Sequence, residues 1–534
     1  MAPTGRSHQS LKLLGHLEDL HRRDGRFREE PKGGPPSEGQ PLTAGGGERG
    51  LQAWNCRRSL SFEVPASSSP LGQCGSPPLG DGLVHGDIPG DKSPARTRSE
   101  LHWRGFLALP CDLGPGPAAS RLLVPRLGGC SNGGIADVFT VFAKTQVKDV
   151  TTGEVHGKIS AFIVEKEFEG VTSGPPERKM GIRASNTTSV IFNNVKVPTE
   201  NVLGGFGNGF KVAMSILNNG RFGTVSAMAG TMRRMIKKAA NHAAKRKQFG
   251  KQICDYGIIQ EKLARMAMYH YVAESMAYLI SGNMDTKVPD FHLEAALSKV
   301  FASEAAWEVA DECIQILGGA GYMKKARVEQ IMRDLRIFRI LEGTNDILRI
   351  FVALAGLQHA GAQLEELQHT LEDPLNNSAV LFTELGLRAK RIIGIPTGIS
   401  LDGVVSGHLL DTASLVTKCV DLLSEAVEHL LLKFGTEVVY QQFHLRRVAD
   451  TAMDIYSMGV VLSRATQSLN HNLPSATHEK LLCESWCYKA SERVRWNLRS
   501  VKASSWNSYY QNMKTISNEV VRNGGVIYSR PMGF

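Results

Sequence analysis

This sequence lacks any run of the roughly 18 consecutive apolar residues that a membrane-spanning helix requires. It also lacks a disulfide framework, because its nine cysteines show no paired spacing. Cys483 and Cys487 have no second pair or histidine cluster that would complete a zinc site. We expect these two to be packed thiols in a reducing compartment. The net charge of +10 is spread along the chain without an arginine and lysine stripe, so no nucleic-acid-binding module is indicated.

Sustained periodicity is missing from residues 1–129. This segment holds 15 of the 23 prolines and 21 of the 54 glycines, which together exceed a quarter of its residues. Such a composition is typical of a segment that does not fold. We therefore expect residues 1–129 to be a disordered, low-complexity segment. The first 30 residues are basic, but acidic residues interrupt them, so they give only a weak targeting signal and no clear transit peptide.

Short strands are indicated after residue 129. The stretches DVFTVFAK, KISAFIVEK and TSVIFNNVKV are rich in β-branched and aromatic residues, and turns that contain glycine or proline separate them. This pattern predicts antiparallel strands. We interpret residues 130–206 as a partial β-domain.

The apolar residues then adopt a helical period. They share one face over residues 259–280 and again over 293–317, and a further helix is expected to begin near Thr344. Long amphipathic helices joined by short loops are typical of an antiparallel bundle, which we place at 207–363.

A turn-rich linker around RIIGIPTGIS, residues 364–404, separates the bundle from a second helical block at 405–534. The predicted fold class is therefore α+β and mainly α. It comprises a partial antiparallel β-domain, a helical bundle and an additional C-terminal helical domain.

Two short motifs interrupt the helical pattern. QILGGAGY, residues Gln315–Tyr322, is compatible with an ordinary glycine C-cap, and also with a turn whose backbone N–H groups approach a phosphate. It is not the GxGxxG fingerprint of dinucleotide-binding folds. KRKQFGKQI places Arg246 near Phe249. This is either an exposed basic turn or a cation and aromatic pair suited to a pyrophosphate and an adenine ring.

The stretch FRILEGTNDILRIF places one carboxylate, Glu342, among large apolar side chains. Burial of a charged group costs several kcal/mol unless the group is paired or neutralised. One interpretation is that Glu342 points to water from a turn, before a helix for which Thr344 and Asn345 are good N-caps. The alternative is a functional carboxylate in an apolar pocket.

The order VPTENVLG, NNGRF, RKQFGKQI, QILGGAGY and RDLRIFRILEGTNDILR resembles the acyl-CoA dehydrogenase family, over residues 131–534. The helical tail beyond Leu357 is similar to that of the family's very-long-chain mitochondrial members. A similar tail occurs in the member that doubles as a complex I assembly factor. The resemblance implies FAD as cofactor and dehydrogenation of long- or very-long-chain acyl-CoA to trans-2-enoyl-CoA in mitochondrial fatty acid β-oxidation. Electrons are then expected to pass to electron-transfer flavoprotein.

The resemblance also implies roles for individual residues. Glu342 matches the catalytic base that removes the α-proton of the thioester, and an apolar pocket would raise its pKa towards neutrality. The backbone N–H at Glu342 is expected to help polarise the thioester carbonyl. The Gln315–Gly319 turn matches a contact with the FAD of a neighbouring subunit, so a homodimer is expected. No metal is implied. The implied cofactor-binding residues are Ser131, Arg246, Gln248, Phe249, Gln315, Ile316, Leu317, Gly318, Gly319, Thr344, Asn345 and Asp346, and the implied substrate-binding residues are Asn218, Asn219, Gly220, Arg221, Leu341 and Gly343.

The sequence departs from the family pattern at several positions. A tryptophan expected before Ser131 is absent, Lys325 stands where an acidic residue is usual, and Gln330 stands where a basic residue is usual. The family's N-terminal helical domain and the first half of its β-domain have no counterpart, and residues 1–129 look unrelated to them. The alternative to an enzyme is therefore a non-catalytic scaffold or assembly factor, or an inactive fragment.

Contact with a membrane is a further expectation. In the linker, Arg388, Lys390 and Arg391 precede three isoleucines, which fits shallow attachment to anionic lipid. By resemblance we expect peripheral contact with the matrix side of the mitochondrial inner membrane. A nearby apolar stripe indicates either core packing or part of this contact, and it comprises Leu415, Cys419, Leu422, Ala426, Leu430 and Phe434.

Overall fold

A computed structural model describes residues 109–110, 120–148, 153–288, 291–371 and 400–528. Before residue 128 and over 363–371 it describes the backbone alone. Most of the segment expected to be disordered, and the basic residues Arg388, Lys390 and Arg391, lie outside the described residues.

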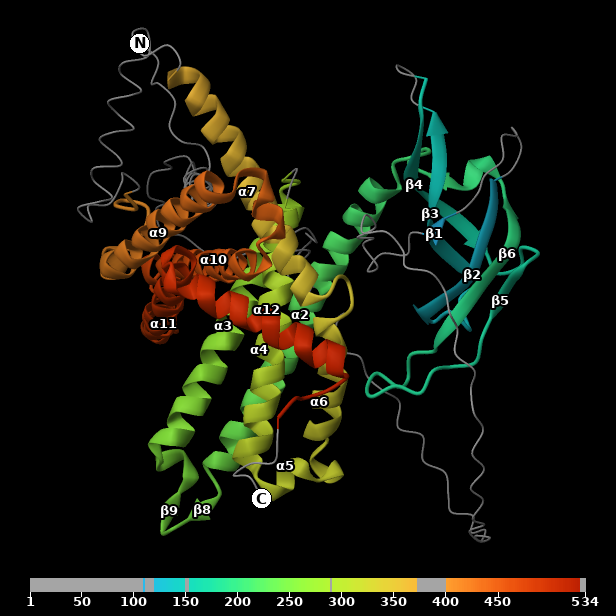
Figure 1. Cartoon of the computed structure of the whole chain (residues 1–534). Helices are drawn as coiled ribbons and strands as arrows, with labels where there is room; N and C mark the ends of the chain where they lie inside the picture. Colours follow the sequence, from blue (N-terminus) through green and yellow to red (C-terminus); the bar gives the residue numbers. More distant parts are fainter. Residues whose placement is uncertain (1–108, 111–119, 149–152, 289–290, 372–399, 529–534) are drawn as a thin grey trace, which may run out of the picture. The chain divides into compact units, whose positions relative to one another are not determined.

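Two small sheets share one core (Figure 1). The first has the order β1 (Leu109–Pro110), β3 (Val138–Lys148), β4 (Val155–Glu165) and β7 (Val202–Leu203), with β1 parallel to β3 and the other pairs antiparallel. The second is antiparallel, in the order β2 (Ser120–Ser131), β6 (Thr187–Val197) and β5 (Val171–Ser173). The three predicted strands are confirmed as β3, β4 and β6. Phe162 and Val164 of β4 meet Phe192 and Val195 of β6 in the core.

The strand β2 corrects one expectation. It begins at Ser120, so residues 120–129 are not part of a disordered segment as their composition had suggested. The sequence SRLLVPRLGGCS concealed the strand because a proline cannot donate to the ladder. The pairing with β6 shifts register between Val124 and Leu127, which is where Pro125 falls. An irregular strand accommodates the proline that a regular one would exclude.

Three long helices form the frame of the bundle (Figure 1): α2 (Gly209–Ala243), α3 (Gly257–Asp285) and α4 (His292–Leu317). The predicted helical segments 259–280 and 293–317 are confirmed as α3 and α4. Because α4 packs against both other helices, most of its circumference is buried, and even Lys299 is 0% exposed. Between α2 and α3 lie the hairpin of β8 (Lys247–Gln248) and β9 (Lys251–Gln252) and the 3-10 helix η4 (Ile253–Asp255).

Short helical pieces follow α4 before the next long helix. They are α5 (Gly319–Tyr322), η5 (Lys324–Ala326), α6 (Val328–Leu335) and η6 (Arg336–Arg339). The long helix α7 (Asn345–Leu371) starts next to Thr344, as expected, and continues past the predicted end of the bundle at residue 363. The turn between η6 and α7 carries Glu342.

The predicted C-terminal helical block is confirmed. It contains η7 (Gly407–Leu409), α9 (Leu410–Phe434), η8 (Gly435–Tyr440), α10 (Gln442–Asn470), α11 (Ala476–Lys502) and α12 (Ser505–Asn523). Its apolar residues form one continuous core with those of the bundle. At the junction, Trp486 of α11 packs edge-on against Phe301 of α4, with 5.4 Å between ring centroids.

The apolar stripe of α9 belongs to this core. Cys419, Ala426 and Leu430 are buried, and the other members of the stripe pack against the core. Core packing is therefore the correct interpretation of the stripe. Within the ranges that the structure describes, no helix combines the length and the apolar character needed to cross a membrane.

The two cysteines of α11 are packed thiols, as predicted. Cys483 and Cys487 are each 0% exposed and form no disulfide. Burial raises the pKa of the Cys487 thiol well above its usual range, so the thiol stays protonated and unreactive.

Candidate active site

Glu342 lies in a turn with unusual backbone geometry. Its φ is +55° and that of Gly343 is +94°, so two consecutive residues occupy the left-handed region. Glycine adopts this region without steric cost, whereas a residue with a side chain is held there at a cost of roughly 1 to 3 kcal/mol. After the turn, the Thr344 hydroxyl accepts a 3.4 Å hydrogen bond from the N–H of Ile347 and caps α7. The surroundings must therefore hold Glu342 in place.

Helix α2 provides the first part of these surroundings. The Thr224 hydroxyl donates a 3.2 Å hydrogen bond to Glu342 Oε2. One turn earlier, Gly220 leaves the space that the carboxylate fills, because a Cβ at this position would lie 2.5 Å from Glu342 Oε1. The carboxyl group therefore lies against the backbone of α2.

Helix α4 provides the second part through Lys299. Its ammonium group is fully buried and donates to the carbonyl of Gly343 at 2.8 Å and to Asn345 Oδ1 at 3.0 Å. Burial lowers the pKa of Lys299 to about 8, although the nearby Glu342 carboxylate favours the charged form. Lys299 thus fixes the turn from the inside of the bundle.

Arg221 is a second buried cation near the carboxylate. It is 2% exposed, and its Nη1 donates to Asn218 Oδ1 at 3.0 Å, while the amide of Asn218 contacts the ring of His292. Among the described residues its Nε has no hydrogen-bond partner. Burial lowers the pKa of Arg221, and attraction to Glu342 opposes this effect. An orphaned buried donor beside the carboxylate suits a polar ligand group.

The Glu342 carboxyl group is tuned by opposing effects. Burial raises its pKa, whereas the Thr224 hydrogen bond and the charges of Lys299 and Arg221 lower it, and the net direction is upward. A carboxylate with a raised pKa is a competent general base near neutral pH. Within the described residues there is no cluster of three or more side chains that could hold a metal ion. The raised pKa of the Glu342 carboxyl group suits the site to proton abstraction.

The residues on either side of Glu342 divide between the site and the core. Asn345 is 3% exposed, and its side-chain amide donates to Ser303 Oγ and to Glu304 Oε1, each at 3.0 Å. This side chain therefore points into the bundle. Leu341 and Thr344 are half-buried, and Asp346 is exposed.

A second group of predicted residues belongs to elements at one end of the bundle, where Figure 1 shows the β8–β9 hairpin and α5. Arg246, Gln248 and Phe249 are exposed on the β8–β9 hairpin, and Phe249 is 95% exposed. The last turns of α4 run towards the same end, since the Cys313 thiol contacts the Met235 carbonyl in the second half of α2.

At the end of α4, only some of the predicted cofactor-binding residues are exposed. Gln315, Gly318 and Gly319 are exposed, whereas the side chains of Ile316 and Leu317 are in the core. At about 1.5 Å per residue, Gln315 lies about 24 Å along α4 from Lys299. The structure therefore separates this group from the turn of the same chain. Ser131 is elsewhere again, exposed at the end of β2 opposite Thr187.

The sequence did not single out Lys299, Thr224 or Glu304. Lys299 lies opposite the acidic face of its helix, and its neighbours three and four residues away are all small: Ala295, Ala296, Ala302 and Ser303. A lysine surrounded in this way has no polar face to occupy, and this was the available signal for a buried cation.

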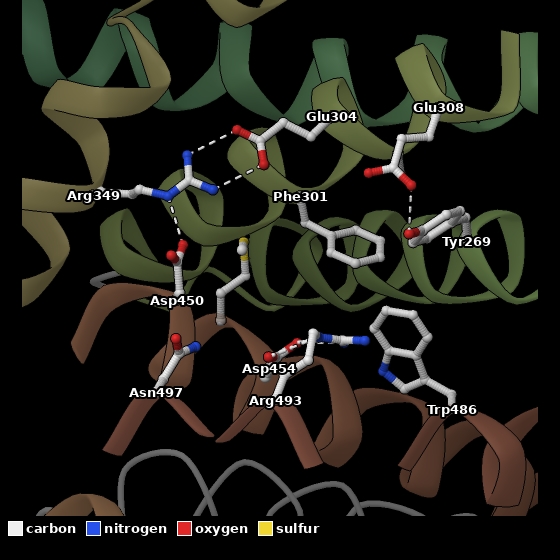
Figure 2. Close-up of a pocket in the computed structure, with 12 residues that line it drawn as sticks. Tyr269, Phe301, Glu304, Glu308, Arg349, Asp450, Asp454, Trp486, Arg493 and Asn497 are labelled. Atoms are coloured by element: carbon white, nitrogen blue, oxygen red, sulfur yellow. Dashed lines mark hydrogen bonds and ion pairs between the residues drawn. The ribbon is translucent and has the colours of Figure 1, made fainter. Parts of the chain in front are cut away.

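A cavity of about 230 Å³ lies on the other side of Glu304, where α3, α4 and α7 meet α10 and α11 (Figure 2). On its wall, Arg349 binds both oxygens of Glu304 at 2.8 Å and Asp450 Oδ1 at 2.6 Å. Its lining residues are Tyr269, Phe301, Glu304, Ala305, Glu308, Arg349, Asp450, Met453, Asp454, Trp486, Arg493 and Asn497.

Comparison with known proteins identifies three domains. Residues 130–195 match the family model described as acyl-CoA dehydrogenase, middle domain, and residues 207–357 match acyl-CoA dehydrogenase, C-terminal domain. Residues 407–526 match ACAD9/ACADV, C-terminal domain.

The chain is also similar to whole proteins. It is 54% identical over 405 residues to the very long-chain specific acyl-CoA dehydrogenase, mitochondrial, of Bos taurus, and 53% identical to that of Homo sapiens. Each match covers 76% of this chain and 62% of the relative, so the chain spans less than two thirds of their length. Among solved structures, an acyl-CoA dehydrogenase complexed with FAD from Bacillus anthracis is 28% identical, with a TM-score of 0.60 over 74% of this chain and 67% of that one.

Proposed function

Over residues 130–526 the chain belongs to the acyl-CoA dehydrogenase family, and we propose that it dehydrogenates long- or very-long-chain acyl-CoA to trans-2-enoyl-CoA with FAD as cofactor. The observation that carries this proposal is the Glu342 carboxyl group. It is held in a strained turn, hydrogen-bonded by Thr224, and its pKa is raised by burial.

In the proposed reaction Glu342 removes the α-proton of the thioester. The carboxylate must be ionised to accept a proton and basic enough to hold it. The raised pKa makes it a stronger base, while the Thr224 hydrogen bond and the charges of Lys299 and Arg221 favour its ionised form. Thr224 and Gly220 orient the carboxylate from α2, so its position is set before the substrate arrives. The Glu342 backbone N–H makes no backbone hydrogen bond among the described residues, which leaves it available to the thioester carbonyl.

FAD is supported by the exposed group at the far end of the bundle. Arg246 can pair with a pyrophosphate, the exposed ring of Phe249 can stack, and Gln315 and the glycine turn at 318–319 can approach a phosphate. When bound, FAD supplies the hydride acceptor for the β-carbon. Because this group is far from the same chain's Glu342, we propose that it serves a neighbouring copy in a homodimer.

The names of two relatives include the word mitochondrial, so we propose a mitochondrial location. On the family resemblance we also propose peripheral contact with the matrix side of the inner membrane, and electron-transfer flavoprotein as electron acceptor. A non-catalytic assembly role is the second candidate. It rests on the C-terminal domain, because the family model that matches residues 407–526 is named for two family members rather than one.

The test is spectroscopic and kinetic. The purified full chain should show the two flavin absorbance bands and should reduce an artificial electron acceptor when given acyl-CoA thioesters of increasing chain length. The flavin bands should bleach on addition of a very-long-chain substrate. A colourless dimer that gains no activity when FAD is added would overturn the proposal and favour the assembly role.

The buried Lys299 near Glu342 gives a prediction about the pH dependence of kcat. Replacement of Lys299 by Met removes a positive charge that stabilises the Glu342 carboxylate, so the pKa of Glu342 should rise further. The ascending limb of kcat against pH should then move to higher pH, and kcat at pH 7 should fall on the order of tenfold. The matched control is Lys262→Met, which removes a partly buried lysine that pairs with Glu312. An unmoved limb in Lys299→Met would contradict the role of Lys299.

A further inference from the structure

The C-terminal helices reach the turn of Glu342 through a series of direct polar contacts. We propose that Asp450 of α10 is a positioning residue for Glu342, acting through Arg349, Glu304 and Asn345. This assigns the C-terminal domain a part in the catalytic geometry, and its kinetic consequence rests on the proposed function.

The first link crosses from the C-terminal helices to the bundle. Asp450 Oδ1 accepts a 2.6 Å hydrogen bond from Arg349 Nε, and the Arg349 side chain is 11% exposed. The remaining guanidinium nitrogens donate to the two oxygens of Glu304, each at 2.8 Å (Figure 2). A bidentate pair fixes orientation as well as distance. Asp450 therefore determines how Arg349 is presented to Glu304.

The second link runs from Glu304 to the turn. Glu304 Oε1 also accepts the amide of Asn345 at 3.0 Å, and Asn345 Oδ1 in turn accepts from Lys299, which holds the Gly343 carbonyl. Burial raises the pKa of Glu304, but the Arg349 hydrogen bonds outweigh it and the net pKa is lowered. Glu304 thus stays ionised and bridges the guanidinium and the asparagine.

The cavity explains why Asp450 matters to this series. Glu304, Arg349 and Asp450 all line it, so packing is incomplete on that side and polar contacts hold the guanidinium (Figure 2). If Asp450 loses its charge, Arg349 has space to move and can draw Glu304 away from Asn345. A turn with two left-handed residues persists only while its surroundings hold it. Removal of the Asp450 charge should therefore loosen the turn that carries Glu342.

The test compares two contacts that join the same two domains. Asp450→Asn weakens the contact that leads to the turn. The control, Arg464→Met, removes a contact from the same helix α10 to Glu274 of α3, at 3.1 Å, which does not lead to the turn. Hydrogen exchange of a peptide covering residues 341–348 reports on the turn, because the N–H groups of Leu341 and Leu348 are bonded to carbonyls on either side of it.

We expect exchange in residues 341–348 to be about tenfold faster in Asp450→Asn and unchanged in Arg464→Met. Added to Asn345→Ser, Asp450→Asn should have little further effect, because the series is already broken. If Asp450→Asn does not fold, Arg349→Lys takes its place, since a lysine cannot hold both carboxylates in the same way. Equal exchange in the test and control variants, or additive effects in the double variant, would overturn the inference.

The kinetic readout separates this inference from the proposed function. In an active enzyme, Asp450→Asn should lower kcat about tenfold with little change in KM, and Asp450→Glu should recover part of the loss. If the wild-type chain has no activity, the proposed function fails, but the exchange measurement still decides the inference. An active enzyme whose kcat is unaffected by Asp450→Asn would overturn the inference alone.

Discussion

Replacement of Glu342 by Gln should lower dehydrogenation on the order of 10⁴-fold while flavin content stays unchanged. The amide retains the shape of the carboxyl group, so the turn and the Thr224 contact can persist. It cannot accept the α-proton, so the chemical step loses its base. The measurement is a single-turnover bleaching experiment with a saturating long-chain acyl-CoA, together with the ratio of flavin to protein absorbance.

The control for this variant is Glu308→Gln. Glu308 lies on α4 and accepts a 2.7 Å hydrogen bond from Tyr269, away from the turn. This substitution also removes one carboxylate from the bundle, but it should leave the bleaching rate unchanged. Substantial turnover by Glu342→Gln would remove Glu342 from the role of base.

The second large effect is expected from Gly220→Ala. The added Cβ would lie 2.5 Å from Glu342 Oε1 and 2.9 Å from its carboxyl carbon. The carboxylate is the end of a flexible side chain, so it should move rather than unfold the protein. A displacement of about 1 Å can cost a factor of roughly 100 in rate, so kcat should fall by about that factor. The temperature of thermal unfolding should change little. The higher helix propensity of alanine, worth up to about 1 kcal/mol, opposes the cost of displacing the carboxylate.

Helix α2 offers a matched control three residues further on. A Cβ at Gly223 meets nothing within 4 Å. Gly223→Ala should therefore raise the unfolding temperature slightly through helix propensity and leave kcat unchanged. If both alanine variants retain full activity, the close contact between α2 and the carboxylate is not needed for catalysis.

The local pattern of the sequence predicted the elements that follow a regular period. The alternation of apolar and polar residues in β3, β4 and β6, and the apolar faces of α3 and α4, could be predicted because each pattern repeats within one element. Strand β2 could not be predicted, because Pro125 and neighbouring glycines give this segment the composition of a disordered one. Its stability comes from pairing with β6, which lies far along the chain.

The site was predictable only in part for a similar reason. The apolar setting of Glu342 and the family resemblance together indicated a base, and the structure adds how the carboxylate is held. The contacts that hold it join residues far apart in sequence, such as Thr224 to Glu342 and Lys299 to Gly343. No local pattern encodes such pairs. Asn345 illustrates the limit: the family resemblance implied a cofactor contact for it, and only the structure shows that its side chain is bonded within the bundle.

The continuous core across α4, α10 and α11 has a consequence for the protein in the cell. Apolar residues of the bundle and of the C-terminal helices are buried against one another. A substitution that destabilises the C-terminal helices should therefore raise the fraction of chains in which both parts are unfolded. Quality-control proteases would then remove those chains. Most substitutions in the core of α10 and α11 should therefore reduce how much protein accumulates.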